Sequence, residues 1–121
     1  MVLVDTSVWV SHLRNGNIEL ANLLNNGSVL CHPLIVGELA CGNLKDRTVI
    51  LSFLKLLPMS IEAEHEEVFS FIENNRFMGK GIGYADAQLV ASAVLTGVPI
   101  WTLDKKLSQV ADGLHIKYKN S

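Results

Sequence analysis

The sequence predicts an α/β protein: a three-layer α/β/α sandwich with a central, mainly parallel sheet, formed as a single domain over residues 1–121. Short apolar runs alternate with longer segments whose apolar residues recur at helical spacing, an order typical of parallel strands joined by helices. The composition agrees, because 49% of the residues are apolar and only 18% are charged, which suits a sheet covered on both faces. A chain of 121 residues suits one hydrophobic core rather than two.

The first half of the chain contains clear signals for where helices begin and end. Asn17 is a good helix-capping residue, Gly27 is of the type that ends helices, and Pro33 stands where prolines start them. The apolar runs VLVD and SVLCH give the first two strands. We therefore predict a strand over 2–5, helices over 7–14 and 18–26, a strand over 28–32, helices over 33–42 and 46–56, and a brief strand over 57–61.

The second half begins with the clearest helix of the sequence. In residues 62–78 the apolar residues near one face are Val68, Phe69, Ile72 and Phe77, and glutamates in the first turn suit the helix dipole. The glycine-rich GKGIG then predicts a flexible break. A helix over 84–96, a strand VPIWTLD over 98–104, a short helix and a last strand over 115–119 complete the predicted order.

Four acidic residues stand where the apolar pattern does not explain them. Asp5 and Asp104 end two predicted strands, and the carboxyl ends of parallel strands open onto one edge of the sheet, where such folds bind ligands. Asp86 and Glu38 each lie on an otherwise apolar face of a predicted helix, judged from the residues at helical spacing. The candidate site therefore consists of Asp5, Glu38, Asp86 and Asp104.

Each acid also has an ordinary structural explanation. Asp5, Asp86 and Asp104 stand near helix starts that they could cap, and Glu38 could pair with Lys45. Four separate coincidences near one edge explain the pattern less well than one shared site does. We therefore favour the shared site.

Four carboxylates at one edge require compensation. Two like charges about 4 Å apart repel by roughly 4 kcal/mol at an effective dielectric constant near 20. The group must therefore take up protons or bind cations. Oxygen ligands without a histidine or cysteine cluster favour Mg²⁺ or Mn²⁺ over zinc, and a carboxylate-held Mg²⁺ commonly acts on phosphates. The four acids are thus predicted metal ligands, with one ion and two ions both open.

Cationic residues near the acids are candidate contacts for RNA phosphates. They are Arg14, Lys80, Lys105 and Lys106, and ordinary surface charge is the alternative for each. The formal net charge of −2 does not by itself support a nucleic-acid partner, but metal ions at the four acids would offset it. His32, at the end of the second predicted strand, is either a site residue or a structural one.

The cysteines and the apolar runs bear on the compartment. Cys31 and Cys41 lack metal-binding spacing and are predicted to be free, buried thiols. No apolar run approaches the length of a membrane span, and no basic stretch precedes the first apolar residues. We therefore expect a cytoplasmic protein without membrane association.

Four motifs, taken in order, resemble those of the PIN-domain ribonucleases, and in particular the VapC toxins of toxin–antitoxin systems. They are VDTSVW, VGEL, GIGYADAQLVASA and WTLD, and they cover essentially the whole chain. The resemblance implies a metal-dependent endoribonuclease, the toxin of a type II toxin–antitoxin system, that cleaves RNA phosphodiesters with a metal-activated water. It also implies Mg²⁺ or Mn²⁺ as cofactor, an RNA substrate, a VapB-type antitoxin partner and a homodimer.

The resemblance also assigns roles to individual positions. Thr102 matches a hydroxyl residue that accompanies the last acid and is a further candidate catalytic residue, and Thr6 or Ser7 is implied to order the first acid. Relatives often carry a second acid where this chain has Lys106, which is then either an RNA contact or a change that weakens the metal site. The family's acidic quartet corresponds to Asp5, Glu38, Asp86 and Asp104.

Other functions fit only parts of the pattern. A catalytically silent PIN-like module that binds RNA or protein would be favoured by the loss of an acid, and all four are present. A phosphatase of the haloacid dehalogenase type would carry a second aspartate where this chain has Ser7. A receiver domain would show paired acids and a lysine at a later strand end, for which the sequence has no clear counterpart.

Overall fold

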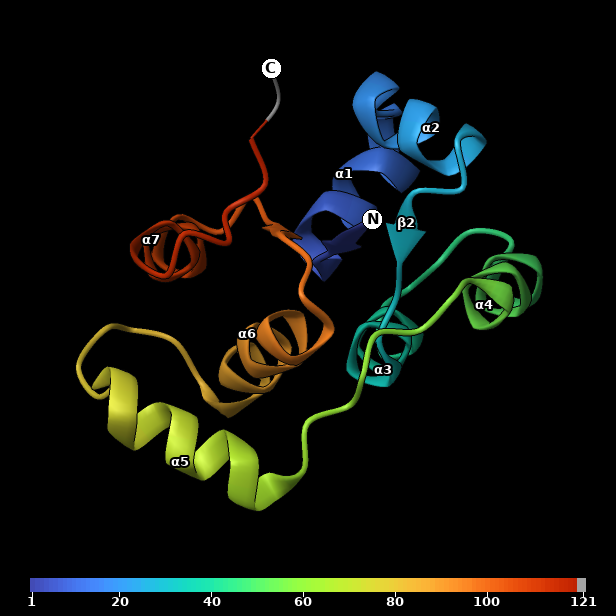
Figure 1. Cartoon of the computed structure of the whole chain (residues 1–121). Helices are drawn as coiled ribbons and strands as arrows, with labels where there is room; N and C mark the ends of the chain where they lie inside the picture. The colour runs from blue at the N-terminus through green and yellow to red at the C-terminus, as the bar shows by residue number, and fades with distance from the viewer. Residues whose placement is uncertain (120–121) are drawn as a thin grey trace.

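A parallel sheet of three short strands lies at the centre of the computed structural model, which describes residues 1–119 (Figure 1). The strands are ordered β2-β1-β3, so the first strand of the chain is central and both neighbours run parallel to it. Leu3 pairs with Leu30 on one side and with Ile100 on the other. The α/β fold predicted from the sequence is thereby confirmed. The strands are β1 (Val2–Val4), β2 (Val29–Leu30) and β3 (Ile100–Trp101).

Two further predicted strands each contribute a single bridge at an edge of this sheet. Met59 pairs in parallel with Cys31, just after β2, and Lys117 pairs in parallel with Ile100 in β3. These segments are the ones predicted as strands over 57–61 and 115–119. Both lie at the expected places, but only one residue of each pairs with the sheet.

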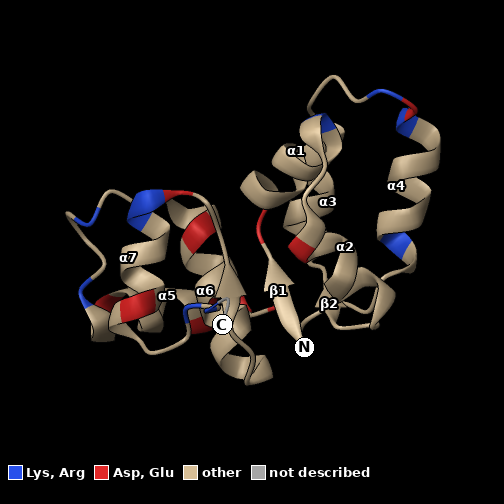
Figure 2. Cartoon of the chain, turned by 90° about the horizontal axis from the view of Figure 1, so that it is seen from above, with Lys and Arg blue, Asp and Glu red and all other residues tan. Residues whose placement is uncertain are grey.

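Seven helices within residues 1–119 enclose the sheet in two groups (Figure 2). Helices α1–α4 lie on one side and α5–α7 on the other, in agreement with the predicted arrangement of layers. Helix α3 packs against α1 and α4, and α5 packs against α6. The helices are α1 (Thr6–Asn15), α2 (Ile18–Asn25), α3 (Pro33–Ala40), α4 (Arg47–Leu56), α5 (His65–Asn75), α6 (Tyr84–Thr96) and α7 (Lys105–Gly113).

The helix boundaries follow the sequence signals closely, and α5 shows the largest difference. It begins at His65 rather than at residue 62, because the Glu67 side chain accepts the Glu64 N–H at 2.9 Å and so caps the helix there. It ends before Arg76, whose φ of 53° is left-handed and cannot continue a helix. Helix α5 is therefore shorter at both ends than the helix predicted over 62–78.

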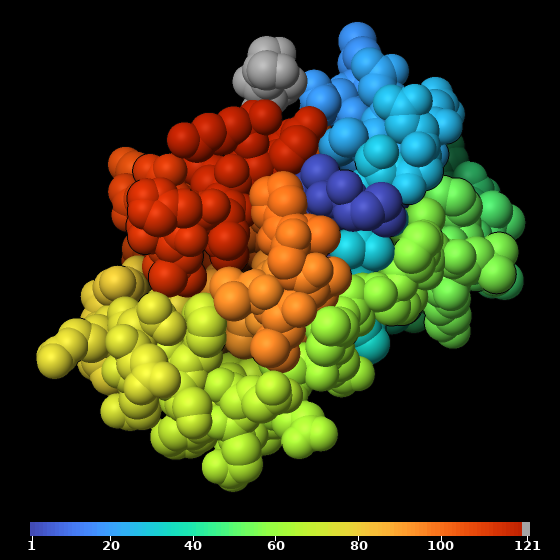
Figure 3. Space-filling view, viewed as in Figure 1, coloured from blue at the N-terminus to red at the C-terminus, as the bar shows by residue number. Residues whose placement is uncertain are grey.

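Helix α6 is the most deeply buried helix. Every residue of its central part, from 87 to 93, is buried. In Figure 3 the orange residues of this region lie between the red C-terminal residues and the yellow-green residues of α5. A helix packed so tightly holds its first turn, which includes Asp86, in a fixed position relative to the sheet.

The two cysteines differ in exposure. Both are free, as predicted. Cys31 is buried beside the sheet, and burial raises the pKa of its thiol. Cys41 is exposed at the C-terminal end of α3, so the prediction that both thiols are buried was wrong for this residue. Within residues 1–119, no helix has both the length and the apolar composition needed to cross a membrane.

Candidate active site

Asp5 lies directly after β1, where the strand meets α1, and only 6% of its surface is exposed. Its Oδ2 accepts hydrogen bonds from Thr102 Oγ1 at 2.7 Å and from Ser7 Oγ at 2.8 Å. The Ser7 N–H also points at Oδ2, at 3.4 Å, which makes Asp5 the N-cap of α1. These donors compensate the buried carboxylate, and none of the three bonds uses Oδ1. Asp5 is thus held by one oxygen and keeps the other for a further ligand.

The two hydroxyls that hold Asp5 also organise the segment after β3. Ser7 Oγ accepts the Leu103 N–H at 2.9 Å, and Thr102 Oγ1 accepts the Asp104 N–H at 3.0 Å. Each hydroxyl therefore donates to Asp5 and accepts from the backbone beside the last acid. The ends of β1 and β3 are joined through side chains as well as through the sheet.

Asp104 is the exposed N-cap of α7. Its Oδ1 accepts the Leu107 N–H at 2.9 Å, which orients the side chain at the start of the helix. The second carboxylate oxygen takes no part in that bond. Like Asp5, Asp104 therefore has one oxygen engaged by the fold and one available to a ligand.

Glu38 lies in the second half of α3 and reaches the first turn of α1. Its Oε1 accepts a hydrogen bond from Thr6 Oγ1 at 3.1 Å. The pairing with Lys45 considered from the sequence does not form, since the one ion pair within the described residues joins Lys119 to Asp112. Glu38 itself is exposed, although other residues of its helix face are buried.

Asp86 lies in the first turn of α6 and is half-buried. Burial raises the pKa of its carboxyl, and the negative charges of Asp5, Asp104 and Glu38 raise the pKa further, in that order. A backbone hydrogen bond at Gly83 acts in the opposite direction. The other three predicted acids are the ones whose charges act on Asp86. The fold agrees, because Asp5 and Asp104 follow the neighbouring parallel strands β1 and β3, and Thr6 at the start of α1 contacts Glu38.

The donor set of this site suits a hard divalent cation. The four carboxylates offer only oxygen donors, and a cation would relieve the repulsion that raises the pKa of Asp86. As the side chains stand, no three His, Cys, Asp or Glu residues among residues 1–119 are close enough to hold one ion together. Mg²⁺ usually keeps several waters and binds through one or two carboxylates, so looser spacing is compatible with it.

Helix capping accounts for two of the four acids. Asp5 and Asp104 are N-caps of α1 and α7, as the structural alternative expects. Asp86 is not a cap, because the N-cap of α6 is Gly83. Capping therefore leaves Asp86 and Glu38 unexplained, and in the other two residues it engages only one carboxylate oxygen.

Three of the predicted cationic contacts line pockets. Lys80 and Lys106 line a pocket of about 560 Å³ beside α7. Arg14 lines a second pocket, of about 250 Å³, together with Thr6 and Glu38. That second pocket adjoins the acidic site directly.

His32 has a structural role. It is fully buried and is the N-cap of α3. Its Nδ1 accepts the Leu34 N–H at 3.0 Å, so the neutral ring carries its proton on Nε2, which lies 3.1 Å from Ser92 Oγ. Burial lowers the pKa of this imidazole, and the charge of Glu62 offsets part of that effect. Within the described residues, the hydrogen bonds of His32 therefore stabilise the start of α3 and its packing against α6. Of the two roles that the sequence left open for His32, these bonds support the structural one.

Together, the fold and the site define an α/β protein whose acidic residues converge at the carboxyl edge of a parallel sheet. The family model of the PIN domain matches residues 2–113. The chain therefore belongs to the PIN-domain family, and the resemblance seen in its motifs is confirmed.

Individual relatives agree with this assignment. The chain is 43% identical to Ribonuclease VapC32 of Mycobacterium tuberculosis, in strains CDC 1551 and H37Rv, over 108 residues that cover 88% of this chain and 87% of the relative. The structure of FitAcB from Neisseria gonorrhoeae has a TM-score of 0.63 at 23% identity, with 93% of this chain and 94% of that chain covered. PAE2754 from Pyrobaculum aerophilum has a TM-score of 0.63 at 15% identity, with 93% and 80% covered. At these identities the two structures support the fold alone.

Proposed function

We propose that this chain is a metal-dependent endoribonuclease and the toxin component of a type II toxin–antitoxin system. The observation that carries the proposal is that Asp5 and Asp104 follow the neighbouring parallel strands β1 and β3 and are joined through the hydroxyl of Thr102, which contacts both. The relative that shares 43% identity is named a ribonuclease, VapC32, which supports RNA as the substrate.

In this proposal Asp5, Glu38, Asp86 and Asp104 hold Mg²⁺ or Mn²⁺, and Thr102 is a positioning residue for Asp5. When bound, such an ion lowers the pKa of a coordinated water and stabilises the charge that develops on the phosphodiester. The residues of the chain supply the orientation: hydroxyl bonds fix one oxygen of Asp5, and a helix N–H fixes one oxygen of Asp104. Asp86 lies in the first turn of α6, whose central part is buried.

The proposed protein partners are a VapB-type antitoxin and a second copy of the chain. Three apolar residues of α4 support a protein interface: Val49 is 69% exposed, Phe53 is 44% exposed and Leu56 is 85% exposed. Their spacing places them on one side of the helix. A solvent-facing apolar stripe is typical of a surface that another protein covers. The single-domain organisation over 1–121 and the cytoplasmic location stay predictions.

The test compares the wild type with Asp5→Asn and Asp86→Asn on structured RNA, in Mg²⁺, in Mn²⁺ and in EDTA. Asparagine also caps helices, so Asp5→Asn removes the charge and retains the cap. Glu73→Gln, on the exposed surface of α5, is the matched acid-to-amide control. Circular dichroism verifies that each variant is folded.

We expect cleavage by the wild type and by Glu73→Gln with either ion, none in EDTA, and a loss of about a hundredfold or more in both site variants. Cleavage that survives EDTA and both substitutions would point to a contaminating nuclease and contradict the proposal. A folded wild type that binds RNA without cutting it would favour the silent binding module instead.

A further inference from the structure

The Lys106 side chain lies against the backbone of Gly81. A Cβ atom built on Gly81 would be 2.5 Å from Lys106 Cδ and 3.0 Å from both Cε and Nζ. An added Cβ would therefore displace the lysine side chain, and the φ of +79° at Gly81 also favours glycine. Gly81 therefore stands at the point where the Lys106 side chain crosses the loop before α6.

This contact joins the two segments that carry the last two acids of the site. Gly81 lies in the loop that leads into α6, whose first turn contains Asp86. Lys106 lies in the first turn of α7, whose N-cap is Asp104. Lys106 therefore belongs to the segment of Asp104 and contacts the loop that leads to Asp86.

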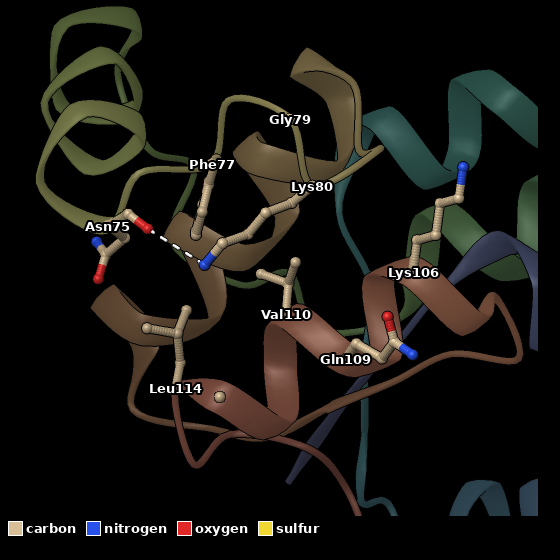
Figure 4. A pocket seen from close by; sticks show the side chains of 9 residues that line it. Asn75, Phe77, Gly79, Lys80, Lys106, Gln109, Val110 and Leu114 are labelled. Carbon is tan, nitrogen blue, oxygen red and sulfur yellow. Dashed lines mark hydrogen bonds between the residues drawn. The ribbon is translucent and has the colours of Figure 1, made fainter.

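The pocket lined by Lys106 has the chemistry of an anion site. It measures about 560 Å³, also contains Lys80 and the amides of Asn75 and Gln109, and includes no acidic residue in its lining. Lys80 Nζ donates to Asn75 O at 3.4 Å and lies 5.8 Å from the centroid of the Phe77 ring. Figure 4 shows Lys80 directed toward the Asn75 carbonyl, while Lys106 extends away from it.

Lys106 has no acceptor of its own. Within residues 1–119 it makes neither an ion pair nor a side-chain hydrogen bond. A lysine that is constrained by a neighbouring loop, yet has a free ammonium group, is available to bind a ligand of opposite charge.

We propose that Lys106 binds a backbone phosphate of the RNA next to the phosphate that is cleaved. This inference rests on the proposed nuclease function. A cluster of four carboxylates repels RNA, and the formal net charge of the chain is −2, so binding requires fixed positive charge at the margin of the site. An acid at position 106 would add to the repulsion, whereas the lysine attracts the strand.

The experiment measures binding of a short fluorescent single-stranded RNA to the folded Asp5→Asn protein, which keeps the pocket and removes cleavage. Into this parent we introduce Lys106→Ala, Lys106→Arg or Gly81→Ala. Lys55→Ala is the matched control, because Lys55 is an exposed lysine in the last turn of α4 and does not line the pocket. Anisotropy gives Kd at several salt concentrations.

Loss of one phosphate contact should lower the slope of log Kd against log salt by about 0.7, which corresponds to about fivefold weaker binding at 0.1 M salt. We expect this change for Lys106→Ala and near-parental binding for Lys106→Arg and for Lys55→Ala. We expect weaker binding for Gly81→Ala because the added methyl displaces the lysine. If Lys106 had only a structural role, Lys106→Ala would leave the slope of log Kd against log salt unchanged.

Equal slopes for the parent and Lys106→Ala, or equal losses for Lys106→Ala and Lys55→Ala, would overturn the assignment, as would a parent that binds no RNA. Cleavage of the same RNA by the wild type is measured in parallel and tests the proposed function separately. If the wild type cleaves RNA and Lys106→Ala leaves the salt slope unchanged, the lysine site is refuted and the proposed nuclease function is retained.

Discussion

The hydroxyl of Thr102 donates a hydrogen bond to Oδ2 of Asp5 at 2.7 Å and joins the ends of two neighbouring parallel strands. Thr102 also accepts the Asp104 N–H, so one side chain contacts two of the four acidic residues. The geometry of the site depends on this hydroxyl as well as on the carboxylates.

Replacement of Thr102 by valine should reduce both stability and cleavage. Valine keeps the shape and removes the bond to Asp5 and the acceptor for the Asp104 N–H, so the free energy of unfolding should fall by about 1–3 kcal/mol. Urea denaturation and RNA cleavage measure the two effects. Thr102→Ser retains the hydroxyl and should stay close to the wild type, and an equal loss in the serine variant would contradict this role.

Two substitutions of Asp104 should separate its capping role from its charge. Asp104→Asn keeps a side-chain acceptor for the Leu107 N–H, whereas Asp104→Ala removes it at a cost of about 1 kcal/mol. We therefore expect only the alanine variant to be less stable in urea. Both should lose metal-dependent cleavage. An asparagine variant with full activity would show that Asp104 serves only as a cap.

Asp86→Asn should stabilise the metal-free protein at neutral pH. The pKa of Asp86 is raised in the folded state, so folded chains retain this proton to higher pH than unfolded chains, and the stability associated with Asp86 falls as pH rises through the folded pKa. The advantage of the asparagine variant should therefore shrink toward about pH 4, near the ordinary aspartate pKa. Urea midpoints across pH in EDTA measure it. A constant difference at all pH values would refute the electrostatic origin.

Added Mg²⁺ gives a further check on the same residue. A cation that binds only the folded site raises the thermal midpoint with saturation. We expect this increase in the wild type and a smaller one in Asp86→Asn, because the variant offers one carboxylate fewer. Differential scanning fluorimetry measures the increase in the thermal midpoint. The increase in Glu73→Gln should equal that of the wild type. Equal shifts in all three proteins would indicate nonspecific ion effects.

His32 should make stability fall as the solution becomes mildly acidic. Burial lowers its pKa in the folded state, so below about pH 6.5 the unfolded chain takes up a proton that the folded imidazole does not. The contribution is complete above that pH and is lost progressively as pH falls. His32→Asn keeps a capping side chain and should show a shallower pH dependence in urea denaturation. The exposed His115, replaced by asparagine, is the control and should keep the wild-type slope.

The helices were largely predictable because their signals are local. The bounds of α6 agree with the prediction, Asn17 is the N-cap of α2, and Pro33 is the first residue of α3. Strand lengths were not predictable, because pairing depends on residues far away in the sequence. The runs over 57–61 and 115–119 have strand composition, yet each finds a partner for one residue only.

The acids of the site were predictable, while the contacts that orient them were not. Asp5 and Asp104 follow apolar strands, and that pattern is visible without a structure. Which acid is contacted by Thr6 and which by Ser7 depends on where α1 begins. Thr6 donates a hydrogen bond to Glu38, and Ser7 donates one to Asp5. The contact of Lys106 with Gly81 left no sequence signal beyond a glycine in a loop already rich in glycine.

The order of residues along the chain has a consequence for synthesis. Asp5 is translated well before its partner Thr102, which lies 97 residues further along the chain, and β3 must pair with β1 before the two side chains can meet. A chain that has not yet reached Thr102 lacks one of the two hydroxyls that hold Asp5. The acidic centre is therefore assembled only after β3 has been translated and has paired with β1.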